Sequence, residues 1–98
     1  LSSGKGCVQV LVMSKEIERM KTMILNDMDA GVTLLDGKSG FYGNETEVVL
    51  TILPYRKLPD LKDKIKEIDE KAFIIVSHVE EVSGNGFTYS KEMREVLS

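Results

Sequence analysis

A glycine-rich segment with one lysine and two aromatic residues is the part of this sequence best suited to contact a ligand. Residues 36–45 read Asp-Gly-Lys-Ser-Gly-Phe-Tyr-Gly-Asn-Glu and directly follow a short apolar run. Glycine lets the backbone approach a ligand closely, and successive N–H groups can form a nest for an anion. We therefore predict a site for a small anionic ligand or nucleotide at Gly37, Lys38, Gly40, Tyr42 and Gly43. Lys38 supplies charge there, and Tyr42 a face for stacking.

The spacing of these glycines matches no phosphate-binding motif. The phosphate loop and the dinucleotide fingerprint both lead from a strand into a helix, whose N-terminus faces the phosphate. Here the β-branched and apolar run from Thr46 to Leu53 follows, which predicts a second strand instead. The alternative interpretation is a hairpin loop whose aromatic residues pack at a boundary between subunits. The sequence leaves both interpretations open.

The other reactive residues form no catalytic or metal-binding pattern. There is one cysteine, Cys7, and one histidine, His78, so we expect neither a dedicated zinc site nor an intrachain disulfide. Both lie at ends of predicted strands, where structural placement is favoured over a Cys–His pair for nucleophilic chemistry. Because nothing in the sequence orients the histidine, we predict no enzymatic activity and no cofactor.

Length and charge narrow the function classes further. With 98 residues the sequence predicts one domain, and its net charge of −3 argues against nucleic acid as a partner. No apolar run approaches the roughly 20 residues that a membrane-spanning helix needs. Because the sequence begins at Leu1 rather than at methionine, we expect it to be a piece of a longer protein.

Hydrophobic periodicity predicts four strands and two helices. The strands are expected at Cys7–Met13, Val32–Leu35, Thr46–Leu53 and Ala72–His78, and the helices at Lys15–Ala30 and Pro59–Asp69. Residues 1–6 read as a flexible leader, 7–87 as the domain, and 88–98 as a polar C-terminal tail with a weak helical pattern. The order β-α-β-β-α-β is that of the α+β ferredoxin-like fold. It predicts a four-stranded antiparallel sheet of order 4-1-3-2 with both helices on one face.

The face of the sheet that the helices leave uncovered is expected to carry apolar residues. We assign Leu11, Val49, Leu53 and Ile75 to this face as interface residues. A sheet face exposed to water is usually polar, and a large exposed apolar patch often marks an interface. The sequence therefore favours self-association, or docking onto a parent domain, over a merely solvated sheet.

Four separated blocks of this sequence resemble one known family. The blocks are residues 31–37 (Gly-Val-Thr-Leu-Leu-Asp-Gly), 39–42 (Ser-Gly-Phe-Tyr), 68–76 and 81–87. Together they resemble the C-terminal domain of YitT-type bacterial membrane proteins, in which a multi-helix membrane portion precedes a cytosolic domain of uncharacterised function. That domain looks like the PII signalling proteins in fold. PII proteins are trimers that bind adenine nucleotides between subunits through the loop between strands two and three.

The resemblance implies a regulatory or sensing domain at the cytosolic face of a bacterial membrane protein. Its expected partners are other copies of itself, as a dimer or trimer, and the membrane portion of the parent protein. Gly40 and Tyr42 match the family's Gly-x-Tyr loop, whereas Gly43 stands where the family often has Ser or Thr, so a hydroxyl is missing there. The alternative function is an oligomerisation or docking module that binds no ligand and uses the open sheet face.

Overall fold

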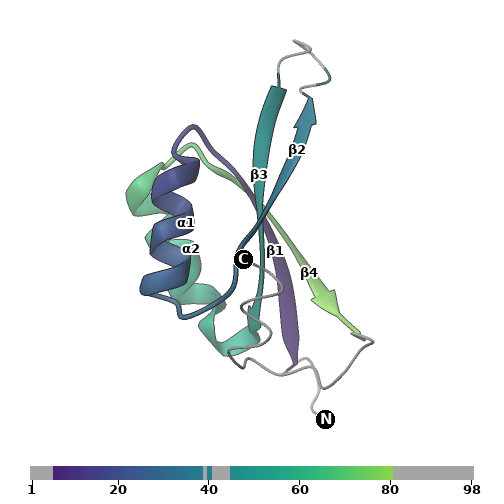
Figure 1. Cartoon of the computed structure of the whole chain (residues 1–98). Helices are drawn as coiled ribbons and strands as arrows, with labels where there is room; N and C mark the ends of the chain where they lie inside the picture. The colour runs from purple at the N-terminus through teal and green to yellow at the C-terminus, as the bar shows by residue number, and fades with distance from the viewer. Residues whose placement is uncertain (1–5, 39, 41–44, 81–98) are drawn as a thin grey trace.

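A four-stranded antiparallel sheet with two helices on one of its faces makes up the described part of the chain (Figure 1). The computed structural model describes residues 6–38, 40 and 45–80. In chain order the elements are β1 (Cys7–Met13), α1 (Ile17–Asn26), β2 (Thr33–Lys38), β3 (Glu45–Pro54), the 3-10 turn η1 (Tyr55–Lys57), α2 (Leu58–Ile68) and β4 (Phe73–Val79). The strand order β2-β3-β1-β4 confirms the ferredoxin-like topology that the sequence predicts.

The core lies between the helices and one face of the sheet. In β1, Val8, Val10 and Val12 are fully buried, while the residues that alternate with them are only partly covered. The helices close this layer with apolar residues at helical spacing, such as Met20 and Ile24 in α1. From α2, Leu61 and Ile65 join the same cluster, so a single core holds all the elements together.

The first helix is shorter than predicted. It ends at Asn26 rather than at Ala30, and Asp29 takes the left-handed conformation, with φ of 52°, that usually follows a helix. Aspartate tolerates this conformation better than most residues because its short side chain can bond locally to the backbone. Met28 and residues 30–32 follow the helix and are buried. Met28 and Val32 therefore belong to the core although neither lies in a helix.

The hairpin between β2 and β3 is longer than predicted. Its strands pair from Thr33↔Leu50 out to Lys38↔Glu45, so Asp36, Gly37 and Lys38 are strand residues rather than loop residues. Figure 1 shows this end of the hairpin reaching well beyond the two helices. The segment that connects the strands is correspondingly reduced to residues 39–44.

Candidate functional site: the open sheet face and the hairpin cleft

The sheet face opposite the helices is uncovered and carries no charge in the described residues. The strand register defines this open face, because residues directly opposite one another in neighbouring strands point to the same side. Its members are Cys7, Gln9, Leu11, Met13, Thr33, Leu35, Gly37, Thr46, Val48, Leu50, Ile52, Pro54, Phe73, Ile75, Ser77 and Val79. No Asp, Glu, Lys, Arg or His occurs among them, although 30% of the whole sequence is charged.

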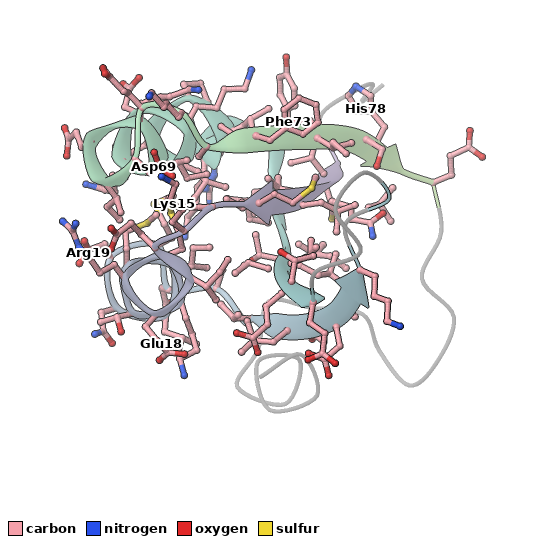
Figure 2. All side chains as sticks on the ribbon, turned by 90° about the horizontal axis from the view of Figure 1, so that it is seen from above. Lys15, Glu18, Arg19, Asp69, Phe73 and His78 are labelled. Carbon is pink, nitrogen blue, oxygen red and sulfur yellow. The ribbon has the colours of Figure 1, made fainter. Side chains whose placement is uncertain are left out.

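The side chains of the open face include two rows that cross all four strands and are apolar except at Thr33. One row runs Leu35, Val48, Met13, Phe73 from β2 to β4, and the next runs Thr33, Leu50, Leu11, Ile75. Phe73 is 63% exposed, Leu35 41% and Ile75 40%. Figure 2 shows Phe73 on β4, at the outer edge of the sheet. The rows thus form a continuous apolar surface of the kind that marks protein interfaces.

Two of the four residues predicted for this face lie on the other side of the sheet. Leu11 and Ile75 belong to the open face, as predicted. Val49 and Leu53, however, are 0% exposed and pack in the core beneath the helices, so the prediction for them was wrong. The run Val48 to Leu53 is apolar on both faces, and the sequence alone did not fix which alternate residues point inward. Val48, Leu50 and Ile52 take the positions on the open face instead.

A hydrogen-bonded threonine fixes the inward side of β3. Thr51 is fully buried, and its Oγ1 donates a hydrogen bond of 2.7 Å to the carbonyl oxygen of Gly31. Buried hydroxyls need such a partner, since an unsatisfied polar group in a core is costly. This bond ties the residues before β2 to the middle of β3. It therefore explains how a threonine is accommodated in the core.

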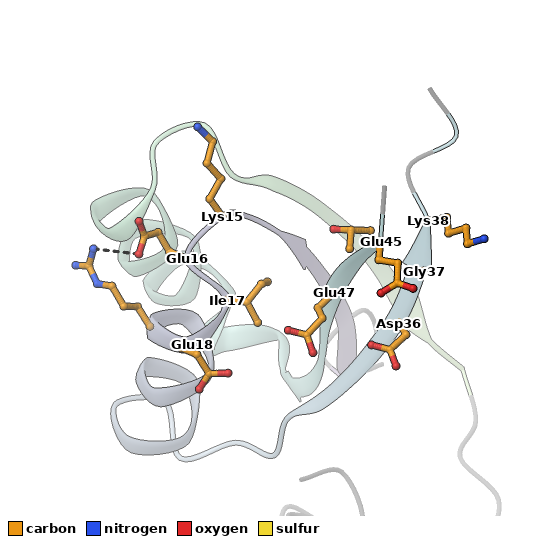
Figure 3. Close-up of a pocket in the computed structure, with 11 residues that line it drawn as sticks. Lys15, Glu16, Ile17, Glu18, Asp36, Gly37, Lys38, Glu45 and Glu47 are labelled. Atoms are coloured by element: carbon orange, nitrogen blue, oxygen red, sulfur yellow. Dashed lines mark ion pairs between the residues drawn. The ribbon is translucent and has the colours of Figure 1, made fainter. Parts of the chain in front are cut away.

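A separate, open cleft of ≈ 900 Å³ lies between the start of α1 and the β2–β3 hairpin. Its charged residues are Lys15, Glu16, Glu18, Arg19, Asp36, Lys38, Glu45 and Glu47, so carboxylates outnumber basic groups. Figure 3 shows the carboxylates of Glu18, Asp36 and Glu47 pointing into the space between α1 and the hairpin, while the Lys38 ammonium points away from α1. This cleft is therefore a poor match for an anion.

The ion pairs around the cleft involve its helix side. Glu16 pairs with Arg19 at 3.8 Å, and Glu18 with Lys21 at 3.0 Å. Within the described residues, the hairpin carboxylates of Asp36, Glu45 and Glu47 form no ion pair. The part of the chain that the structure describes also contains no group of three or more His, Cys, Asp or Glu residues arranged to hold a metal ion.

The predicted ligand residues are only partly brought to this cleft. Gly37 and Lys38 border it, whereas Gly40 does not, and Tyr42 and Gly43 lie outside the described residues. At Gly37 and Gly40 an added Cβ would meet no atom within 4 Å, and neither residue has the positive φ that favours glycine. Neither glycine is therefore required there by backbone conformation or by close packing among the described residues. The ligand site at this loop stays a prediction.

Cys7 and His78 do not form a reactive pair. They sit on neighbouring strands, but Cys7 pairs with Val79 on the open face, while His78 pairs with Val8, a core residue of the opposite face. The His78 ring instead stacks on Tyr55, with ring centroids 5.8 Å apart and an interplanar angle of 28°. The register therefore places the two residues on opposite faces of the sheet.

The end of the sheet beside α1 is held by a contact between two connections. Ser14 Oγ accepts a hydrogen bond of 2.9 Å from the Glu16 N–H, and it donates one of 2.7 Å to Asp69 Oδ2. Asp69 Oδ1 accepts from the Lys71 N–H at 3.0 Å. The Ser14 hydrogen bond, followed by that from Lys71, lowers the pKa of the Asp69 carboxyl.

The order of the elements and of the strands defines a ferredoxin-like α+β domain. Comparisons with known proteins show the family to which it belongs. Residues 30–84 match the DUF2179 family, described as "Uncharacterized protein conserved in bacteria". The chain belongs to this family. A crystal structure of a DUF2179 protein from Eubacterium ventriosum is 31% identical, with a TM-score of 0.65 over 72% of this chain and 97% of that one. A functionally unknown protein from Pediococcus pentosaceus, 15% identical with a TM-score of 0.64, shares the fold.

Curated relatives connect the chain to membrane proteins. The UPF0750 membrane protein YpjC of Bacillus subtilis is 35% identical over 85 residues, which cover 87% of this chain and 29% of that protein. YitT itself, from the same organism, is 29% identical over 63 residues, or 64% of this chain and 22% of YitT. These matches confirm the resemblance to YitT-type proteins. The chain spans less than a third of the length of either relative. No helix in the described residues is long and apolar enough to cross a membrane.

Proposed function

We propose that this chain is a non-enzymatic docking module of a bacterial membrane protein, and that its open face binds an apolar protein surface. The observation that carries the proposal is that the described residues of that face include no charged side chain on any of the four strands. Solvated sheet faces alternate apolar residues inward with polar residues outward. Here the described charged residues of the hairpin, Asp36, Lys38, Glu45 and Glu47, border the cleft beside α1 instead.

The kinship with membrane proteins supports the same function. In the proposal the domain lies at the cytosolic face of the membrane, beside the membrane portion of its parent. A domain held there meets its partners at a raised effective concentration, so a modest apolar surface is sufficient to form a contact. Ligand sensing through the hairpin loop is the alternative, and the excess of carboxylates in the adjacent cleft favours docking over the binding of an anion.

The experiment places a charge on the open face and measures association. In a chimera, this chain replaces the matching segment of YpjC, and the domain is cut from the membrane portion by a protease site after purification in detergent. We expect the cut domain to stay associated, either with the membrane portion or with other copies, and Ile75→Lys to abolish that association. Thr22→Lys, an exposed position on α1, is the matched control.

Two outcomes decide the matter. Loss of association in Ile75→Lys with retention in Thr22→Lys supports docking through the open face. Equal association of both variants, with unchanged folding by circular dichroism, rules the open face out as the docking surface.

A further inference from the structure

We propose that the occupant of the open face is a second copy of this chain, packed sheet against sheet about a two-fold axis. This inference rests on the proposed docking function and names its partner. A two-fold interface brings one surface patch against itself, so each charged residue near the axis would face its own like charge. The open face meets this requirement, because its described residues include no charged side chain at all.

The shape of the face favours a pair over a larger ring. Its two rows run across all four strands, from Leu35 to Phe73 and from Thr33 to Ile75, and only Thr33 among their members is polar. Two such sheets pack face to face about 10 Å apart, with strand directions within roughly 30° of each other. In that arrangement each face is covered by one partner along its whole width. A ring of three copies would turn each face toward two neighbours and divide the same rows between them.

The size of the face sets the strength of the contact. Four strands about 4.8 Å apart, with seven residues at about 3.3 Å each, span a flat area of roughly 440 Å². Standard stable interfaces bury about 800 Å² per partner, so this one falls in the weak class. We therefore expect a dimer that forms and dissociates with concentration, and that is favoured when copies are confined to one membrane.

The exposure of the outer residues agrees with this geometry. Phe73 on β4 and Leu35 on β2 stand at opposite edges of one row, and both are substantially exposed. The two-fold partner brings its own rows over them, while Leu11 and Leu50, paired on the two central strands, lie near the axis. Leu11 of one copy thus faces the central residues of the other.

A charge-exchange experiment on the 98-residue chain tests the two-fold pairing. Leu11→Lys and Leu11→Glu are each purified, and their masses are measured by sedimentation equilibrium up to millimolar concentration. We expect the unsubstituted chain to shift from one chain mass of 11.0 kDa toward twice that mass, and each variant alone to stay a monomer. An equimolar mixture of the two variants should recover the dimer, because opposite charges then meet near the axis.

A second variant keeps the test decisive if the Leu11 variants misfold. Ile75→Lys introduces a charge at a site that is already 40% exposed, and it should weaken the dimer at least tenfold. Thr22→Lys on α1 should leave the dimer unchanged. Thermal unfolding followed by circular dichroism verifies that each variant is folded.

The other outcomes overturn the inference in distinguishable ways. A dimer that survives Leu11→Lys and Ile75→Lys places the contact at an edge strand, and a mass of three chains contradicts the two-fold axis. An unsubstituted chain that stays a monomer at every concentration refutes the second copy as occupant. If, in that case, Ile75→Lys still releases the cut domain from the membrane portion of the chimera, the docking function is supported and the membrane portion is the partner.

Discussion

Ser14 and Asp69 are 55 positions apart in the sequence and joined by a hydrogen bond of 2.7 Å. Ser14 lies in the connection from β1 to α1, and Asp69 in the connection from α2 to β4. The bond therefore ties the two helix-bearing halves of the fold together at one end of the sheet. Because β1 and β4 carry half of the open face between them, the contact also helps to set the position of that surface.

Asp69 should make the stability of the domain depend on acid pH. Folding lowers its pKa, mainly through the Ser14 hydrogen bond, so the native state favours the ionised carboxylate. The contribution is present above the unfolded pKa of about 3.9 and is lost as the pH falls through the lower folded value. In urea unfolding, Asp69→Asn should be less stable than the parent chain near neutral pH. This difference should shrink below about pH 4.

The control for this prediction is Asp63→Asn, an exposed position on α2. It should leave the acid dependence of the parent chain unchanged. A stability difference between the parent chain and Asp69→Asn that stays constant down to acid pH would contradict the assignment.

Thr51 should be the most sensitive polar residue of the core. Thr51→Val keeps the shape of the side chain but removes the donor to the Gly31 carbonyl. An unsatisfied buried acceptor costs about 1–3 kcal/mol of unfolding free energy. Thr51→Ser keeps the hydroxyl and loses one methyl group, so it should lose about 1 kcal/mol. Chemical denaturation of both variants checks the prediction, and a Val variant as stable as the parent chain would show that the bond contributes nothing net.

Gly37 should tolerate a side chain. Its backbone is that of a strand, and nothing lies within 4 Å of an added Cβ. Gly37→Ala should therefore change the free energy of unfolding by less than about 0.5 kcal/mol, as ordinary surface substitutions do. Thermal unfolding measures this directly. A large loss of stability would indicate a close approach at Gly37 that the structure does not contain.

Adenine nucleotides should not stabilise the domain. The cleft beside the hairpin holds more carboxylates than basic groups, so a polyphosphate would be repelled from it. A thermal-shift titration with ATP should be flat, because a ligand that binds the native state raises the midpoint with its concentration. A saturable rise that Tyr42→Ala abolishes would instead establish the ligand site predicted from the loop sequence.

The sequence was sufficient to predict the topology because its local signals agreed with one another. The alternation of valines in Cys7–Met13 predicted β1 to the residue, and β3 extends one residue beyond the predicted strand Thr46–Leu53 at each end. Helix ends were harder to place, since Met28 and Ala30 continue the apolar pattern of α1 although the helix has already ended. They pack into the core from an irregular segment, which periodicity cannot distinguish from a helix.

The candidate surface was predicted only in part, for a different physical reason. Apolar residues occupy both faces of β3. A strand with either set of alternate residues turned inward would therefore bury a similar amount of apolar surface, and the sequence alone does not distinguish the two. A contact between residues remote in sequence distinguishes the two faces of β3. Thr51 points inward and bonds to the Gly31 carbonyl, and Val49 and Leu53, on the same face, lie in the core. The charge-free character of the open face became visible only when the register of all four strands was known.

The most direct test of the open face measures its accessibility as the chains come together. Ile75→Cys and Thr22→Cys are each made in a Cys7→Ser background, and the rate of thiol labelling is followed from dilute to concentrated protein. The account predicts that labelling at position 75 slows as the concentration rises, while labelling at position 22 does not. Labelling rates that are independent of concentration at both positions would contradict it.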